Sequence, residues 1–188
     1  MAKHRTVAER AAAREARAER EAAALASDPV EYTRALMLRS LNAAPRTRAQ
    51  LAELLASRGV PHDVATAGLD RFTELGLIDD AEYARMWVRS RQQQRGLSRR
   101  VLRMELQRKG IGTHDIESAL DLVDEADEQD AAVAFARKKA RSMGSLAAPV
   151  RRQRLMGALM RRGYSPEAAA RALREALDEA EDDDFVDF

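Results

Sequence analysis

The stretch Leu102-Arg-Met-Glu-Leu-Gln-Arg-Lys-Gly110 decides the fold, because two variants of it occur elsewhere in the chain. They are Leu51-Ala-Glu-Leu-Leu-Ala-Ser-Arg-Gly59 and Leu155-Met-Gly-Ala-Leu-Met-Arg-Arg-Gly163, so the three glycines are spaced by 51 and 53 residues. Within each copy two leucines lie four residues apart, which places both on one face of a helix. A further leucine follows ten residues after each glycine. This period of about 50 residues indicates a repeat array.

Helix start and stop signals surround the repeated pattern. The stretches that begin at Asp28, Thr47 and Asp79 are similar to capping boxes, and Ser98, Thr113 and Ser165 are further N-cap candidates. Glycine often follows the last residue of a helix, so we expect helices to end near glycines 59, 76, 96, 110, 144 and 163. These signals predict helices over 29–42, 48–58, 62–75, 80–95, 99–109, 114–125, 127–142, 150–162 and 166–180.

The predicted fold class is therefore all-α, with three tandem three-helix (helix–turn–helix-like) repeats that form an elongated, curved array. Each repeat consists of a longer leading helix and a tight helix pair. Residues 4–26 are nearly all Ala, Arg and Glu, so a helix there would be polar on every side and is expected to stay outside the core. The predicted parts are a leader at 1–27, repeats at 28–78, 79–126 and 127–180, and an acidic tail at 181–188.

Composition argues against several classes of protein. The chain has no cysteine, which excludes disulfides and thiolate sites, and no apolar run of the roughly 20 residues that a membrane-spanning helix needs. Without an apolar signal at its start, the chain is expected to be cytoplasmic. It lacks a glycine-rich phosphate loop, and His4, His62 and His114 are isolated. Asp79, Asp80 and Glu82 suit the first turn of a helix better than a metal site. We expect no enzymatic activity, no cofactor and no metal.

The net charge of +1 conceals a strong segregation of charge. Residues 85–109 contain nine basic residues and one acid, Glu105, and residues 137–162 contain no acid. From Glu175 onward the chain is acidic. Because cations that repel one another gain from an anionic partner, the pattern favours a polyanion partner over a merely solvated surface. The candidate contact residues are Arg89, Arg91, Arg95, Arg99, Arg100, Arg103, Arg108 and Lys109, then Arg137, Lys138, Lys139, Arg141, Arg151, Arg152, Arg154, Arg161 and Arg162.

Two features bear on how such a partner is bound. Tyr83 and Trp87 lie one turn apart among the arginines and could stack on bases, but together with Met86 they fit the pattern of core anchors better. In a DNA-reading helix–turn–helix the second helix enters the major groove. Here the second helices of the predicted pairs are neutral or acidic, which argues against sequence-specific readout in the groove.

The central repeat resembles a known family. Gly76-Leu-Ile-Asp-Asp-Ala-Glu-Tyr-Ala-Arg85 and Arg95-Gly-Leu-Ser-Arg-Arg-Val-Leu-Arg-Met-Glu-Leu-Gln-Arg-Lys-Gly-Ile111 are similar to the signature of the RecX family of bacterial recombination regulators. Arg161-Arg-Gly-Tyr-Ser-Pro-Glu-Ala resembles the closing motif of that family, and the likeness extends from about Asp28 to Leu177. The leader and the acidic tail lie outside it.

The resemblance implies a modulator of the RecA recombinase. Similar proteins bind in the groove of the RecA–single-stranded DNA filament, inhibit its ATPase, strand-exchange and coprotease activities, and need no active site. The expected partners are thus the RecA filament and single-stranded DNA, bound directly or through RecA, by a monomer. Two alternatives stay open: a non-specific nucleic-acid-binding module that competes for single strands, and a scaffold that binds no nucleic acid. A further hypothesis is that the acidic tail competes with DNA for the basic faces.

Overall fold

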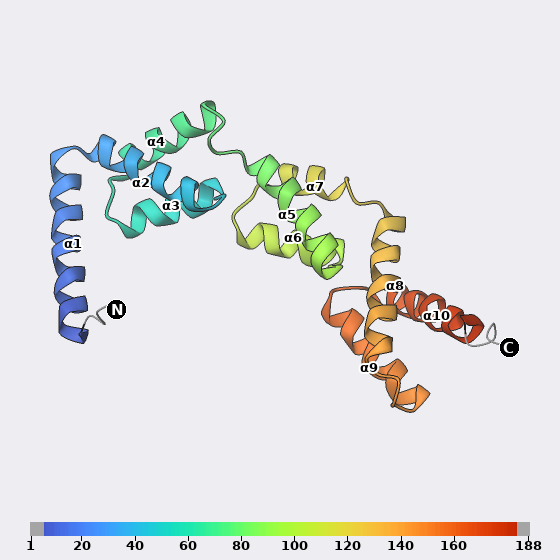
Figure 1. Cartoon of the computed structure of the whole chain (residues 1–188). Coiled ribbons are helices and arrows are strands. Elements are labelled where there is room, and N and C mark those ends of the chain that lie inside the picture. Colours follow the sequence, from blue (N-terminus) through green and yellow to red (C-terminus); the bar gives the residue numbers. More distant parts are fainter. Residues whose placement is uncertain (1–5, 184–188) are drawn as a thin grey trace. The chain divides into compact units, whose positions relative to one another are not determined.

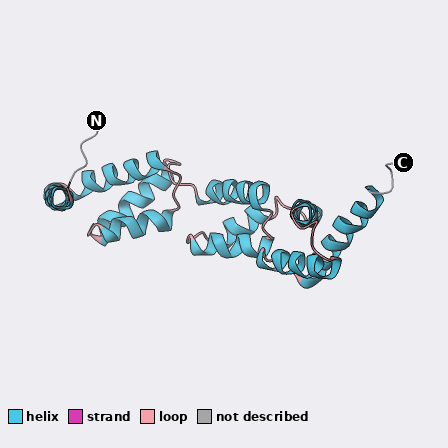
Figure 2. Cartoon of the chain, turned by 60° about the horizontal axis from the view of Figure 1, so that its bottom comes forward, coloured by secondary structure: helices cyan, strands magenta, loops and turns pink. Residues whose placement is uncertain are grey.

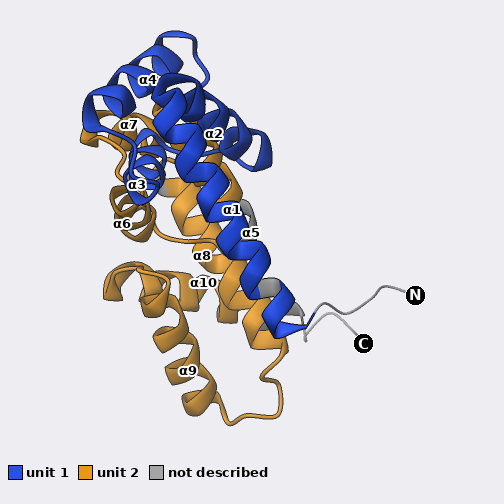
Figure 3. Cartoon of the chain, turned by 90° about the vertical axis from the view of Figure 1, so that its left-hand side faces the viewer, with its two compact units in different colours: residues 1–79 blue, residues 80–188 orange. Residues whose placement is uncertain are grey.

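The computed structural model describes residues 6–183, apart from the side chains of residues 10, 93–95, 125 and 178–183. This part of the chain consists of helices joined by short turns, without a strand (Figures 1 and 2). The prediction of an all-α fold is therefore confirmed. The chain divides into two compact units, residues 1–79 and 80–188, which are coloured separately in Figure 3.

The first unit contains four helices: α1 (Val7–Ser27), α2 (Pro29–Ala43), α3 (Arg48–Ser57) and α4 (His62–Glu74). Its core is built around Met37, Leu51 and Leu55, which are fully buried. The Thr47 capping box is confirmed, since Thr47 Oγ1 accepts the N–H of Gln50 and the Gln50 side chain accepts the N–H of Thr47. These bonds start α3 so that its two leucines face the core.

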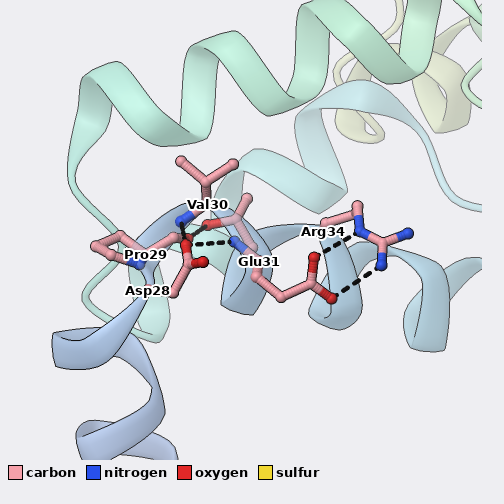
Figure 4. A network of polar contacts seen from close by, with 6 residues as sticks. Asp28, Pro29, Val30, Glu31 and Arg34 are labelled. Carbon is pink, nitrogen blue, oxygen red and sulfur yellow. Dashed lines mark hydrogen bonds and ion pairs between the residues drawn. The ribbon is translucent and has the colours of Figure 1, made fainter.

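The start of α2 differs in detail from the predicted capping box. The Asp28 carboxylate accepts the N–H groups of Val30 and Glu31 at 3.1 and 2.9 Å (Figure 4). The Glu31 side chain does not turn back to the cap as the prediction required. It binds the Arg34 guanidinium through two bonds of 2.8 and 2.9 Å instead (Figure 4), and the Asp28 N–H donates to the Ala24 carbonyl oxygen at the end of α1.

The leader is more ordered than its sequence pattern indicated. It forms α1, which begins at a capping box between Thr6 and Glu9. Leu25 near its end packs against the core of the first unit, and Glu21 makes an ion pair with Arg58 of that unit. The expectation that the leader stays wholly outside the core was therefore wrong for its last turns, where one leucine and one ion pair supply the contacts that the polar helix otherwise lacks.

The second unit contains two three-helix groups. We call α5 (Asp80–Arg95), α6 (Arg99–Arg108) and α7 (Thr113–Leu120) repeat 2, and α8 (Glu125–Arg141), α9 (Ala148–Arg161) and α10 (Pro166–Asp183) repeat 3. Each group has its own buried cluster, centred on Leu102, Leu106 and Leu120 in repeat 2. All nine leucines of the repeated pattern are buried, as the pattern predicts: Leu51, Leu55, Leu69, Leu102, Leu106, Leu120, Leu155, Leu159 and Leu173.

Several predicted helix ends were displaced. Thr113 is the first helical residue of α7 and not its cap, which is Gly112. The α7 helix ends at Leu120, earlier than predicted, because Asp124 accepts the N–H of Asp127 and starts α8. Gly144 ends no helix, since α8 closes at Arg141 with Ser142 as its C-cap. Gly163, in contrast, has the left-handed conformation that favours glycine, with φ of 91°.

Candidate nucleic-acid interface

Two arginines of α6 are bound by groups of α7 and of the turn that follows it. The Arg103 guanidinium donates to both carboxylate oxygens of Glu117, at 2.8 and 2.7 Å. Arg99 donates to the Val123 carbonyl oxygen at 2.9 Å and to the Asp121 carboxylate at 3.3 Å. The bond from Arg103, with smaller contributions from its charge and that of Arg99, holds the pKa of Glu117 below its usual value. Glu117 of α7 and Asp121 directly after it therefore neutralise two of the four arginines of α6.

A second group of basic side chains in repeat 2 surrounds the single tryptophan. The guanidinium of Arg91 lies 4.0 Å, and the ammonium of Lys109 3.9 Å, from the centre of the Trp87 ring. Trp87 donates its indole N–H to Glu105 at 2.8 Å, and Glu105 also lies 3.6 Å from Arg91. The Tyr83 ring stacks on Trp87 at 6.0 Å and is buried. These contacts support the interpretation of both aromatic residues as core anchors.

The other candidate contact residues of repeat 2 fall into three classes. Arg89 makes an ion pair with Glu82 at 3.2 Å. Arg100 and Arg108 are exposed and have no hydrogen-bond or ion-pair partner in the described part of the chain. The Arg95 side chain lies outside the described residues. Met86, which was predicted to be a core anchor, is 39% exposed because it points away from the buried side of α5. We call Arg89, Arg91, Arg99 and Arg103, each bound to a carboxylate, the paired arginines.

Repeat 3 presents its basic residues differently. Within the basic stretch 137–162, five basic residues are exposed, and none of the five has a hydrogen-bond or ion-pair partner among the described residues. Arg162 instead lies against the ring of Phe135 at 3.8 Å, and Arg137, Lys139 and Arg151 are half-buried. Because residues 137–162 contain no acid, nothing within this stretch can neutralise the exposed groups. We call these five the open cations: Lys138, Arg141, Arg152, Arg154 and Arg161.

The two basic stretches of the sequence meet within the second unit. The N–H of Ser98, directly before α6, donates to the carbonyl oxygen of Arg162 at 3.1 Å. The Tyr164 hydroxyl donates to the carbonyl oxygen of Gly96 at 3.0 Å. A Cβ at Gly163 would lie only 2.4 Å from the side chains of Ser98 and Val101, so the turn packs directly on the start of α6. We call this contact between repeats 2 and 3 the joint.

A cleft of 460 Å³ opens beside the joint, between the starts of α6, α8 and α10. Arg99, Arg100 and Arg171 line it, together with the Glu128 carboxylate. Burial, and secondarily the charge of Glu128, raise the pKa of the adjoining Tyr164 to about 12. Arg171 was not among the predicted contact residues, because it lies in an alanine-rich helix that becomes acidic. Arg171 follows the predicted Ser165 N-cap by about two helical turns, and this position is the sequence signal that could have identified it as a contact residue.

The described residues offer little for other chemistry. Among them no three histidine, aspartate or glutamate side chains gather closely enough to hold a metal ion. His62 and His114 are exposed at the starts of helices. None of the helices in the described range combines the length and the apolar character that crossing a membrane requires.

Comparison with protein families supports the same division of the second unit. Residues 79–120 match the model of the second three-helix domain of RecX, and residues 126–173 match that of the third. These ranges correspond closely to repeats 2 and 3.

Curated relatives and solved structures agree with the domain matches. Regulatory protein RecX of Streptomyces coelicolor is 44% identical over 156 residues, which cover 83% of each chain. That of Mycobacterium avium is 46% identical over 149 residues, 78% of this chain and 86% of that protein. The crystal structure of RecX from Lactobacillus salivarius shares the fold, with a TM-score of 0.71 at 23% identity over 80% of this chain and 97% of that one. From this identity over most of its length, the chain belongs to the RecX family of regulatory proteins.

Proposed function

We propose that this protein regulates recombination, DNA repair and the SOS response by binding the RecA–single-stranded DNA filament and inhibiting its ATPase, strand-exchange and coprotease activities. The observation that carries the proposal is the set of open cations on repeat 3. Exposed guanidinium and ammonium groups without internal partners can bind phosphates or carboxylates without first breaking an ion pair. The paired arginines of repeat 2 would first have to leave Glu82, Glu105, Glu117 or Asp121.

The proposal therefore assigns most of the binding energy to repeat 3. Membership in a family of regulatory proteins supports a role in regulation. The contacts of repeat 2 support a structural role for most of its arginines, so we rank the open cations above the paired arginines as contacts. Arg100 and Arg108 remain the two residues of repeat 2 that we expect to contact the partner directly.

The test is the ATPase activity of RecA on single-stranded DNA, titrated with this protein. A variant with Lys138, Arg141, Arg152 and Arg154 replaced by Gln removes four of the five open cations. At 0.15 M salt, removing a cation that binds one phosphate of a single strand weakens binding roughly fourfold, so we expect inhibition to require roughly 200 times more of this variant. The matched control replaces Arg14, Arg20, Arg39 and Arg46, four exposed arginines of the first unit, by Gln and removes the same amount of charge.

Three results would be informative. Inhibition by the natural sequence at well below one protein per RecA, shifted to much higher concentrations in the repeat 3 variant and unchanged in the control, supports a filament regulator. Inhibition only when the protein is abundant enough to cover the free DNA supports the alternative of a competitor for single strands, which the same open cations would also favour. No inhibition at any ratio would contradict the proposed function.

A further inference from the structure

We propose that the cleft at the joint binds a backbone phosphate of a nucleic-acid strand. The proposal rests on the proposed function, in which repeat 3 lies against a filament that contains single-stranded DNA. It adds a defined site, with Arg100 and Arg171 as its binding residues, to the dispersed surface of open cations.

The walls of the cleft are fixed by contacts within the second unit. The backbone bond between Ser98 and Arg162 and the bond from the Tyr164 hydroxyl to Gly96 attach the α9–α10 turn to the start of α6. On the other side, Glu128 of α8 accepts the N–H of Arg99 at 3.1 Å. Three separate segments are thus held around one space before any ligand arrives. A ligand that enters a preformed site loses less entropy than one that must order loops.

The charges within the cleft favour an anion. Arg100, from α6, is exposed and unpartnered among the described residues, and Arg171, from α10, is exposed and also lines the cleft. The Arg99 guanidinium is turned toward α7, where Asp121 and Val123 bind it, so that only its backbone faces Glu128. The Glu128 carboxylate is the single acid among the lining residues, and it already accepts the Arg99 N–H. Arg100 and Arg171 are therefore the exposed cationic side chains that an incoming ligand meets.

A phosphodiester fits this space better than a protein carboxylate. Two guanidinium groups that line one cleft from different helices can bind separate oxygens of one phosphate, in the planar two-bond geometry that arginine adopts. The 460 Å³ cleft is larger than a phosphate group alone and leaves room for the adjoining sugars. A flexible strand can bend into it, whereas a carboxylate fixed on a folded surface is less able to reach the bottom.

The test is binding of a labelled oligothymidylate by fluorescence anisotropy over a range of salt concentrations. We expect Arg100→Gln with Arg171→Gln to lower the slope of log affinity against log salt by about 0.7, the value for one phosphate of a single strand, and to weaken binding roughly fourfold at 0.15 M salt. The control, Arg39→Gln with Arg174→Gln, removes two exposed arginines outside the cleft and should leave the slope unchanged. Arg100→Lys with Arg171→Lys keeps the charge and should restore the slope.

The outcomes separate this inference from the function on which it rests. If the natural sequence binds the oligonucleotide and the Gln variant keeps its slope and affinity, the phosphate site is wrong and the proposed function stands. If the Gln variant loses affinity for polyglutamate but not for DNA, the cleft binds acidic protein and the inference is overturned. If the natural sequence binds neither DNA nor the RecA filament, the proposed function is contradicted, and the phosphate site that rests on it is contradicted as well. Helical circular dichroism of each variant shows whether the fold is retained.

Discussion

Repeats 2 and 3 are similar in fold and in basic charge, yet their basic side chains differ in whether carboxylates within the fold bind them. In repeat 2, Glu117 of α7 and Asp121 directly after it bind arginines of α6, and Glu82 and Glu105 make ion pairs with three arginines of α5. In repeat 3 the basic stretch of α8 and α9 contains no acid, and five of its cations have no internal partner in the described structure. Most arginines of repeat 2 are bound within the fold, whereas under the proposed function the open cations of repeat 3 bind a partner.

The difference teaches that a basic stretch of sequence does not by itself predict a binding surface. What matters is whether the fold brings carboxylates from elsewhere in the chain to the same place. Glu117 and Asp121 lie outside residues 85–109, so counting charges within that stretch misses them. Changes that break the joint, the internal pairs or the charge balance should therefore affect the two repeats unequally.

The largest effect is expected at the joint. Gly163→Ala places a methyl group 2.4 Å from Ser98 and Val101 on a backbone with φ of 91°. Backbone strain and overpacking together should lower the free energy of unfolding by about 3 kcal/mol. Urea unfolding followed by circular dichroism measures the change. Gly144→Ala is the control, because its added methyl meets nothing within 4 Å, and it should change stability by less than about 0.5 kcal/mol. Equal effects would mean that the repeats do not depend on close contact at the joint.

The next largest effect concerns Tyr164 at the joint and is measured as the pH dependence of stability. Tyr164→Phe removes the bond to Gly96 and should cost about 1 kcal/mol at neutral pH. The pKa of Tyr164 is raised to about 12 in the folded protein, so the unfolded state loses this proton first. The natural sequence should therefore lose stability from this residue as pH rises from about 10 to about 12, and the Phe variant should not. Melting temperatures of both proteins across this range should converge. A constant difference would show that the hydroxyl is not buried at the joint.

A smaller effect compares a paired arginine with an open one. Arg103→Gln loses two bonds to Glu117, but the pair is more than a third exposed, so solvent screening limits the cost to about 0.5 kcal/mol. Arg154→Gln should not change stability measurably and should weaken binding to single-stranded DNA roughly fourfold. Denaturant midpoints and anisotropy on the same two proteins provide both readouts. The reverse pattern would contradict the assignment of roles to the two repeats.

Neutralising Glu117, the acidic partner of Arg103, should increase the affinity for DNA, whereas removing a cation should lower it. Glu117→Gln releases the Arg103 guanidinium and should tighten binding to single-stranded DNA by up to roughly fourfold, since one more cation becomes available. Because the pKa of Glu117 is lowered in the folded state, its contribution to stability is present above pH 4.5 and is lost as pH falls below that value. Glu53→Gln, an exposed acid of the first unit, is the control for net charge. If the gain in DNA affinity is no larger than that of the control, the released Arg103 does not contact the DNA.

The smallest expected effect concerns the acidic tail, whose side chains lie outside the described residues. Deleting residues 181–188 removes five acids and should tighten DNA binding a few-fold if the tail competes for the open cations. The gain should shrink as salt is raised, since the competition is electrostatic. Unchanged affinity at low salt would exclude this competition.

Much of the fold could be predicted because it depends on local signals. All nine leucines that the repeated pattern identified are buried, and Thr47 and Ser98 indicated where helices begin. The end of α7 was misplaced because Asp124 caps the next helix, and an aspartate within an acidic stretch looks like ordinary surface charge. The order of α1 was missed because it depends on Leu25 and on Glu21 meeting Arg58, which is distant in sequence.

The candidate site could be predicted only in outline. Charge segregation identified both basic stretches, but it could not separate Arg103, bound to Glu117, from Arg154, which has no partner among the described residues. That distinction depends on contacts between helices. Likewise, nothing local in the sequence indicates that Gly96 and Tyr164 are joined, and so the cleft that contains Arg171 became apparent only in three dimensions.

The environment of Trp87 also gives the protein a built-in optical reporter. It is the single tryptophan of the chain, and its ring lies within 4.0 Å of two cationic groups while its N–H is bonded to Glu105. Its emission therefore depends on the packing of repeat 2 and is remote in sequence from the open cations. A ligand held by repeat 3 should leave the emission wavelength unchanged, whereas one that draws Arg91 or Lys109 away from the ring should shift it. Unlabelled protein can thus reveal which repeat has been engaged.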